Sequence, residues 1–145
     1  MKPISRIVAA AAFSGWLALA SAQPAQEQLD LNALQAAGVQ IAQAVDRNQA
    51  AVLWDGASPA AKRVVTREAF VTSLQRSRAA LGAVASRTWL GLSRQFVGAG
   101  DKLPAGAYIN IDFVTTFAEG KTQRELVSLR QDEDKVWRFV GYVVR

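Results

Sequence analysis

The acidic residue that points most directly to chemistry is Glu125. Its spacing from Val127 and Leu129 places all three side chains on one face of a predicted strand, and that face is apolar. A carboxylate there needs a cationic partner, and Arg78 and Arg87 are the candidates because arginine forms two parallel hydrogen bonds to a carboxylate. We expect either a structural ion pair that fixes a helix against the sheet, or an arginine that binds an anion at the mouth of a cleft.

Aromatic residues form the second candidate group. They could line a ligand pocket between helices and sheet, or they could simply fill the core, as aromatic side chains usually do. The group consists of Trp54, Trp89, Trp137, Phe70, Phe113, Phe117, Phe139 and Tyr142. Gly141 leaves space on the last predicted strand, which suits either a neighbouring ring or part of a ligand. The sequence leaves the choice between an open cleft and a filled core undecided.

A carboxylate base, as in isomerases and hydratases, would be either Glu125 or Asp112, with Tyr108 or Tyr142 as proton donor. Strand alternation places Asp112 opposite in phase to its apolar neighbours, on the outer face together with Tyr108, where a solvated role is expected. No second polar group at a suitable spacing completes an acid–base pair. We therefore predict no catalytic residue and favour a non-enzymatic protein.

The composition excludes most other kinds of catalytic and metal site. The 145 residues include no histidine and no cysteine, so disulfides, thiol nucleophiles and thiolate zinc sites are excluded, and the commonest general base and metal ligand are missing. We predict no cofactor and no metal site. The 17 basic and 12 acidic residues are scattered without a basic run, so nucleic acid is not an expected partner. The glycine-rich segment 98–106 leads into a strand, which indicates a connection and not a phosphate loop.

The N-terminus has the pattern of a secretory signal. Lys2 and Arg6 precede an apolar run over residues 7–19, and small residues end at Ala22, where a signal peptidase would cleave. The apolar run is short for a bilayer, which needs about 20 helical residues. We predict a signal peptide over residues 1–22 and one domain over 23–145, in the periplasm or secreted. Contact with a membrane is expected only if the signal is retained as an anchor.

Hydrophobic periodicity divides the mature chain into helices followed by strands. Helical spacing covers residues 30–54, with a break expected near Asn48, and 66–81, with a short helix after Ser58 between them. Period-two segments follow at 87–97, 107–119, 122–131 and 136–144. The short connections predict an antiparallel meander. The fold class is therefore α+β, with N-terminal helices packed on the apolar face of a curved four-stranded antiparallel sheet.

Several short motifs in this order resemble a known family. They are Arg78-x-x-Leu81-Gly82-x-x-x-x-Arg87, Leu103-Pro104, Gly106-x-Tyr108, Thr115-x-Phe117, Glu125-x-Val127-x-Leu129 and Trp137-Arg138-x-x-Gly141-Tyr142. Together they resemble the domain of unknown function DUF4019. The resemblance implies a small exported bacterial protein with the cone shape of the nuclear transport factor 2-like (NTF2-like), or cystatin-like, superfamily. It implies no activity.

These observations favour a non-enzymatic module that binds a small apolar or anionic ligand or a protein partner. The binding residues we predict are Trp54, Arg78, Arg87, Tyr108, Glu125, Trp137 and Tyr142. An isomerase- or hydratase-like enzyme with a cleft carboxylate is the first alternative. The second is a self-associating structural domain, such as a homodimer, formed through an apolar patch on the outer face of the sheet. That patch would consist of Tyr108, Val114, Val136, Val140, Tyr142 and Val144.

Overall fold

The computed structural model describes residues 28–145, and the predicted signal peptide lies outside this range. The elements are α1 (Leu31–Asp46), α2 (Ala50–Asp55), α3 (Pro59–Val64), α4 (Arg67–Ala79), β1 (Val84–Val97), β2 (Gly106–Phe117), a 3₁₀ turn (Ala118–Gly120), β3 (Thr122–Gln131) and β4 (Trp137–Val144). The strands form one antiparallel sheet in the order β1-β2-β3-β4. The predicted α+β class and meander are confirmed, whereas the nuclear transport factor 2-like cone stays a prediction.

Helices α1, α3 and α4 begin at polar capping residues. Side-chain oxygens of Asp30, Ser58 and Thr66 accept hydrogen bonds from backbone N–H groups in the first turns of α1, α3 and α4. Asn48 has a φ of 58°, a left-handed conformation that asparagine tolerates better than most residues. The break expected near Asn48 is therefore present, and it separates α1 from α2.

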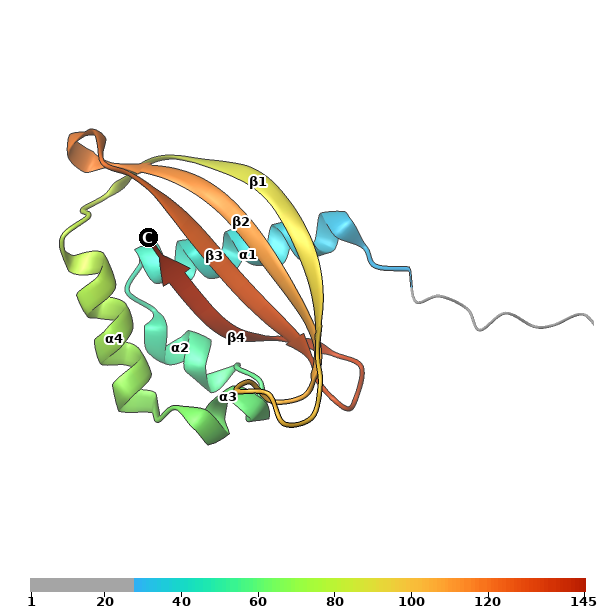
Figure 1. Ribbon diagram of the computed structural model, residues 1–145. Coiled ribbons are helices and arrows are strands. Elements are labelled where there is room, and N and C mark those ends of the chain that lie inside the picture. The colour runs from blue at the N-terminus through green and yellow to red at the C-terminus, as the bar shows by residue number, and fades with distance from the viewer. Residues whose placement is uncertain (1–27) are drawn as a thin grey trace, which may run out of the picture.

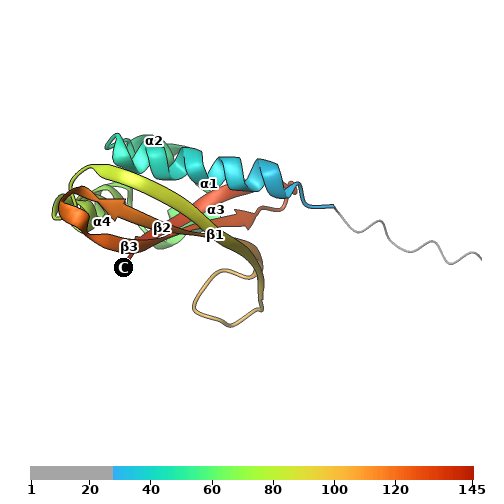
Figure 2. The same cartoon turned by 90° about the horizontal axis from the view of Figure 1, so that it is seen from above.

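Helix α1 covers one face of the sheet, while the connection between β1 and β2 extends on the opposite side (Figure 2). Helices α2, α3 and α4 gather beside β4 (Figure 1). The side chains between α1 and the sheet are buried: Leu34, Ile109, Ile111, Phe113, Val127, Leu129 and Phe139. Gly38 allows the close approach of α1, because a Cβ atom there would lie 2.9 Å from Cγ2 of Ile111. The space between α1 and the sheet is therefore a filled core.

A bulge in β4 decides which side chains of this strand face the core. Ser128 pairs with Gly141, but its neighbour Leu129 pairs with Phe139, so Val140 is an extra residue in β4. Phe139 and Tyr142 consequently both pack against the core. The prediction that Tyr142 belongs to an exposed outer patch is therefore wrong, because simple alternation does not reveal a bulge.

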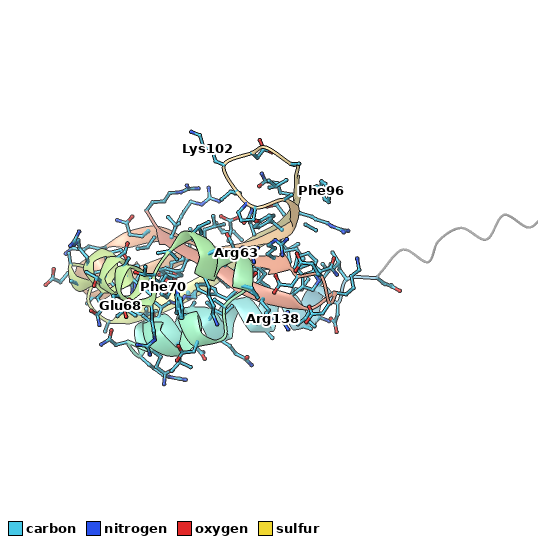
Figure 3. The ribbon with its side chains drawn as sticks, turned by 90° about the horizontal axis from the view of Figure 1, so that it is seen from below. Arg63, Glu68, Phe70, Phe96, Lys102 and Arg138 are labelled. Atoms are coloured by element: carbon cyan, nitrogen blue, oxygen red, sulfur yellow. The ribbon has the colours of Figure 1, made fainter. Side chains whose placement is uncertain are left out.

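Strand β1 is an edge strand and is longer than predicted, since it begins at Val84. Trp89 pairs with Phe113 in the register, yet it stays 44% exposed at this edge. Trp89 therefore does not line an interior pocket. Phe96, at the end of the same strand, is 79% exposed and lies at the base of the loop that carries Lys102 (Figure 3).

Candidate functional site

Glu125 is buried in the middle of a polar cluster within the apolar core. Its exposure is 0%, and Arg87 donates to both carboxylate oxygens, with Nε–Oε2 at 2.6 Å and Nη2–Oε1 at 3.1 Å. The hydroxyl groups of Thr115 and Tyr142 also donate to this carboxylate. The ion pair expected between Glu125 and Arg87 is present, and it joins β1, β2, β3 and β4.

Arg78 enters the same cluster, but through Asp46 and not through Glu125. Arg78 donates to Asp46 at 2.9 Å, and Arg87 donates to both oxygens of Asp46 at 2.9 and 3.0 Å. The guanidinium carbon of Arg78 lies 4.4 Å from the ring centre of Phe117, within cation–π range. The order of contacts is thus Arg78, Asp46, Arg87 and Glu125, and the cluster ties α1 and α4 to the sheet.

The electrostatics of this cluster oppose a catalytic role. Burial alone would raise the pKa of Glu125, but the hydrogen bonds from Arg87, Thr115 and Tyr142 outweigh it, so that this pKa lies below its usual value. Burial and the bond to Glu125 raise the pKa of the Tyr142 phenol. A carboxylate of lowered pKa with these donors around it is a poor general base. Glu125 and Arg87 therefore act together as a structural pair.

A groove of about 200 Å³ lies elsewhere, between α3 and the loop that joins β1 to β2. Its lining residues are Ala60, Ala61, Val64, Gln95, Leu103, Pro104, Tyr108, Asn110, Ser128, Val140 and Gly141. None of these side chains carries a charge. Tyr108, Asn110 and Ser128 lie on the outer face of the sheet, opposite in phase to the core residues Ile109 and Val127.

The polar part of the groove lies on two neighbouring strands. Ser128 of β3 donates a hydrogen bond of 2.8 Å to Oδ1 of Asn110 of β2. Beside them on β4, Gly141 adds no side chain, and a Cβ atom there would have no heavy atom within 4 Å. The space that the sequence predicted at Gly141 is therefore part of this groove.

Tyr108 forms part of the groove and also holds its loop wall. Strand alternation placed Tyr108 on the outer face, and it is there, but it is only 6% exposed because the loop covers it. Its hydroxyl donates to the carbonyl of Pro104 at 2.6 Å. The prediction that Tyr108 is exposed on the outer face is therefore wrong, because a loop of no regular structure covers it.

Asp132 connects the two walls of the groove. Its Oδ1 atom accepts from the hydroxyl of Ser58 at 2.5 Å and from Arg130 at 2.8 Å, and its Oδ2 atom accepts from Arg138 at 3.0 Å. Ser58 in turn caps α3, the first wall. Burial would raise the pKa of Asp132, but the bonds from these three residues lower it below its usual value.

Arg130 links Asp132 to the loop wall of the groove. It donates to the carbonyl of Ala105 at 2.7 Å, and its guanidinium packs against Gly106. A Cβ atom at Gly106 would lie 3.0 Å from Nε of Arg130, and the φ of +148° there also favours glycine. Asp132 and Arg130 therefore position both walls, although neither was among the residues predicted from the sequence. The flanking Arg130 and Arg138 were the signal that could have revealed the network.

The remaining predicted site residues lie apart from one another. The ring of Trp54 packs beneath the Lys62 ammonium group, which lies 5.0 Å from its centre. Trp137 packs against the hydrophobic core. Asp112 pairs with Arg124 at 2.9 Å on the outer face of the sheet. The structure thus brings together Arg78, Arg87, Glu125 and Tyr142, and it separates them from Trp54, Trp137 and Tyr108.

Two absences apply to residues 28–145 alone. In that range no group of three or more acidic side chains has a geometry that could hold a metal ion. No helix there is long and apolar enough to cross a membrane.

A comparison with protein families matches residues 37–142 to the family described as "Protein of unknown function (DUF4019)". The chain belongs to the DUF4019 family. The match covers all four strands up to Tyr142 and most of the helical part, so it includes the Glu125 cluster, the groove and Asp132. Comparisons with curated proteins and with solved structures gave no match. The DUF4019 assignment confirms the predicted family and brings no activity with it.

We predict that Glu125→Gln lowers the free energy of unfolding at pH 7 by roughly 2–4 kcal/mol, because the substitution leaves Arg87 without its buried anionic partner. The folded-state pKa of Glu125 is lowered, so its stabilising effect is complete above the unfolded pKa of about 4.3 and is lost as the pH falls further. The difference between the two proteins in urea unfolding should therefore shrink below about pH 4. Glu119→Gln, at a side chain 81% exposed, is the control. Equal stability of Glu125→Gln and wild type at pH 7 would contradict the structural role.

We predict that Asp132→Asn loosens both walls of the groove, because Asn cannot accept charge-assisted bonds from Arg130 and Arg138 together. Unfolding should become easier by about 2–4 kcal/mol, and hydrogen exchange should accelerate in α3 and in residues 98–106. Asp134→Asn, at a side chain 54% exposed, should change stability by less than about 1 kcal/mol. Unchanged exchange in both walls would show that Asp132 does not position them.

Proposed function

We propose that this DUF4019 protein is a non-enzymatic binding module that holds a small uncharged molecule in the groove between α3 and the β1–β2 loop. The observation that carries the proposal is the uncharged lining: apolar walls and four uncharged polar side chains, Gln95, Tyr108, Asn110 and Ser128. Most small-molecule sites combine apolar walls with a few placed polar groups in this way. A charged ligand would lose its hydration in the groove without gaining an ionic partner.

The size and polarity of the groove define the class of ligand. Its volume of about 200 Å³ is below the roughly 300–1,000 Å³ of drug-sized sites, which favours a single ring or a short alkyl chain. Ser128 takes one acceptor position of Asn110, and no described residue takes the two amide N–H groups of Asn110. A hydroxyl or carbonyl oxygen on the ligand would accept from these N–H groups.

The enzyme alternative has less support. Both oxygens of Glu125 accept hydrogen bonds within the core cluster, and Asp112 pairs with Arg124. Neither carboxylate lines the groove. The anionic ligand that the arginines suggested has little support at Arg87, which bonds to Glu125 and Asp46, while Arg78 bonds to Asp46 through Nη2 alone. Binding without chemistry is the function that these contacts favour.

Export from the cytoplasm is the second part of the proposal, and it rests on the sequence alone. Residues 1–22 have the basic start, the apolar run and the small residues before the cleavage point of a secretory signal. The domain that follows contains no cysteine, so it needs no particular redox environment. We propose a periplasmic or secreted protein that begins at Gln23 after cleavage.

We predict that benzyl alcohol, a single ring with one hydroxyl group, shifts the amide NMR resonances of Asn110, Ser128 and Gly141, and that benzoate binds more weakly. Gly141→Val should abolish this binding because its side chain enters the groove, where nothing lies within 4 Å of the new Cβ atom. Its stability should stay within about 0.5 kcal/mol of wild type, because β-branched residues suit a strand.

Thr88→Val on β1 is the matched control, since it places the same side chain at an exposed strand position outside the groove. It should bind benzyl alcohol as wild type does. If Gly141→Val binds equally well, or if the shifts fall on core residues instead, the groove is not the site.

We predict that the protein expressed in a bacterium with two membranes is recovered from the periplasmic or secreted fraction and that N-terminal sequencing begins at Gln23. Ala22→Leu should block the cleavage, because signal peptidase reads small residues at this position. Recovery of the chain from the cytoplasm with its N-terminal Met1 segment intact would contradict the export proposal.

A further inference from the structure

The free edge of β4 exposes backbone groups that are separate from the groove. β4 is the last strand of the sheet, so one of its edges has no strand beside it. Arg124 and Arg145 exchange two backbone hydrogen bonds, of 2.7 and 2.9 Å. Because bonded and non-bonded pairs alternate along an antiparallel ladder, the backbone groups of Tyr142 and Val144 point away from β3. Two N–H groups and two carbonyl groups therefore face the free edge.

The same edge already binds backbone nearer the start of β4. The N–H group of Ser58 donates to the carbonyl of Phe139 at 2.8 Å, so the segment before α3 covers that part of the edge. Among the described residues, no such bond from outside the sheet reaches Tyr142 or Val144. The edge is thus occupied at Phe139 and open from Tyr142 onward.

A hollow of about 220 Å³ lies beside the open part, between β4 and α4. Its lining residues are Phe70, Ser73, Leu74, Ser77, Tyr142, Val143 and Val144. Two of the four side chains that α4 contributes, Ser73 and Ser77, are short and leave room next to the strand. Figure 1 shows α4 beside the C-terminal end of β4.

We propose that this edge binds an extended peptide segment of another protein, which adds to the sheet as a fifth strand. An extended backbone presents N–H and C=O groups at the two-residue repeat of about 7 Å that Tyr142 and Val144 require. A second copy of this chain supplies no suitable strand, because α4 lies beside the free edge of its β4 and its other edge strand, β1, contains two arginines and no acidic residue. The occupant is therefore a strand that has no helix beside it.

Two arginines that are next in sequence to residues lining the hollow favour acidic side chains on this segment. Arg145 follows Val144 on the strand, and Arg76 precedes Ser77 on α4. Both arginines are exposed, and neither forms an ion pair with any described residue. Rim charges of this kind mainly select partners and accelerate association.

The test uses the peptide acetyl-Glu-Val-Thr-Val-Glu-amide, titrated into the isotope-labelled protein and followed by NMR. We expect the amide resonances of Tyr142 and Val144 to shift and their hydrogen exchange to slow, because both N–H groups gain acceptors. The same peptide with lysine in place of both glutamates should bind at least 3-fold more weakly. Shifts confined to other strands would overturn the proposal.

Two substitutions at one position separate backbone pairing from side-chain contact. Val144→Pro removes the outward N–H group but leaves the bonds to β3 in place, and proline is tolerated on such an edge. It should weaken peptide binding about 3- to 10-fold, the effect of one lost hydrogen bond. Val144→Ala keeps the N–H group and should bind within about 2-fold of wild type. Equal binding by Val144→Pro and Val144→Ala would overturn the proposal.

Two further outcomes complete the test. If the Tyr142 and Val144 resonances move with protein concentration in the absence of peptide, the occupant is a second copy and the proposal is wrong. Benzyl alcohol should leave peptide binding unchanged, because the groove and this edge are separate sites. Either proposal, ligand binding in the groove or peptide binding at the β4 edge, can therefore fail without the other failing.

Discussion

The buried carboxylate of Asp132 is the constraint on which the candidate site depends. It accepts hydrogen bonds from Ser58, Arg130 and Arg138, and its side chain is only 4% exposed. Through Ser58 it fixes the start of α3, and through Arg130 it fixes the loop at Ala105. A groove between a short helix and an irregular loop would otherwise have no rigid frame, since a helix of six residues is not stable alone.

Glu125 has the corresponding role at the other end of β3. It is as deeply buried as Asp132, and its arginine partner also bonds to a second carboxylate, Asp46. The two networks differ in whether open space lies beside them. The Glu125 cluster joins helices and sheet around a filled core, whereas the Asp132 network connects the two walls of an open groove. One end of β3 therefore joins helices to the sheet, and the other frames the groove in which we propose that a ligand binds.

Much of the fold was predictable because it follows from local patterns. The caps at Ser58 and Thr66, the break at Asn48 and the burial of Glu125 all follow from residue type and period. The groove was not predictable, because its walls depend on a long-range contact between Ser58 and Asp132. Tyr142 was predicted both in the aromatic core group and in the outer patch, and the bulge at Val140 that decides for the core was hidden in the sequence. Alternation predicts the face of a side chain only while the register is regular.

The most direct test of the account is to locate a bound ligand by intermolecular nuclear Overhauser effects between benzyl alcohol and the methyl groups of the protein. The account predicts contacts to Val64, Leu103 and Val140, which come from α3, the loop and β4 around the groove. Contacts to Ile109, Val127 or Leu129 would place the ligand between the helices and the sheet. That result would contradict both the filled core and the binding site that we propose.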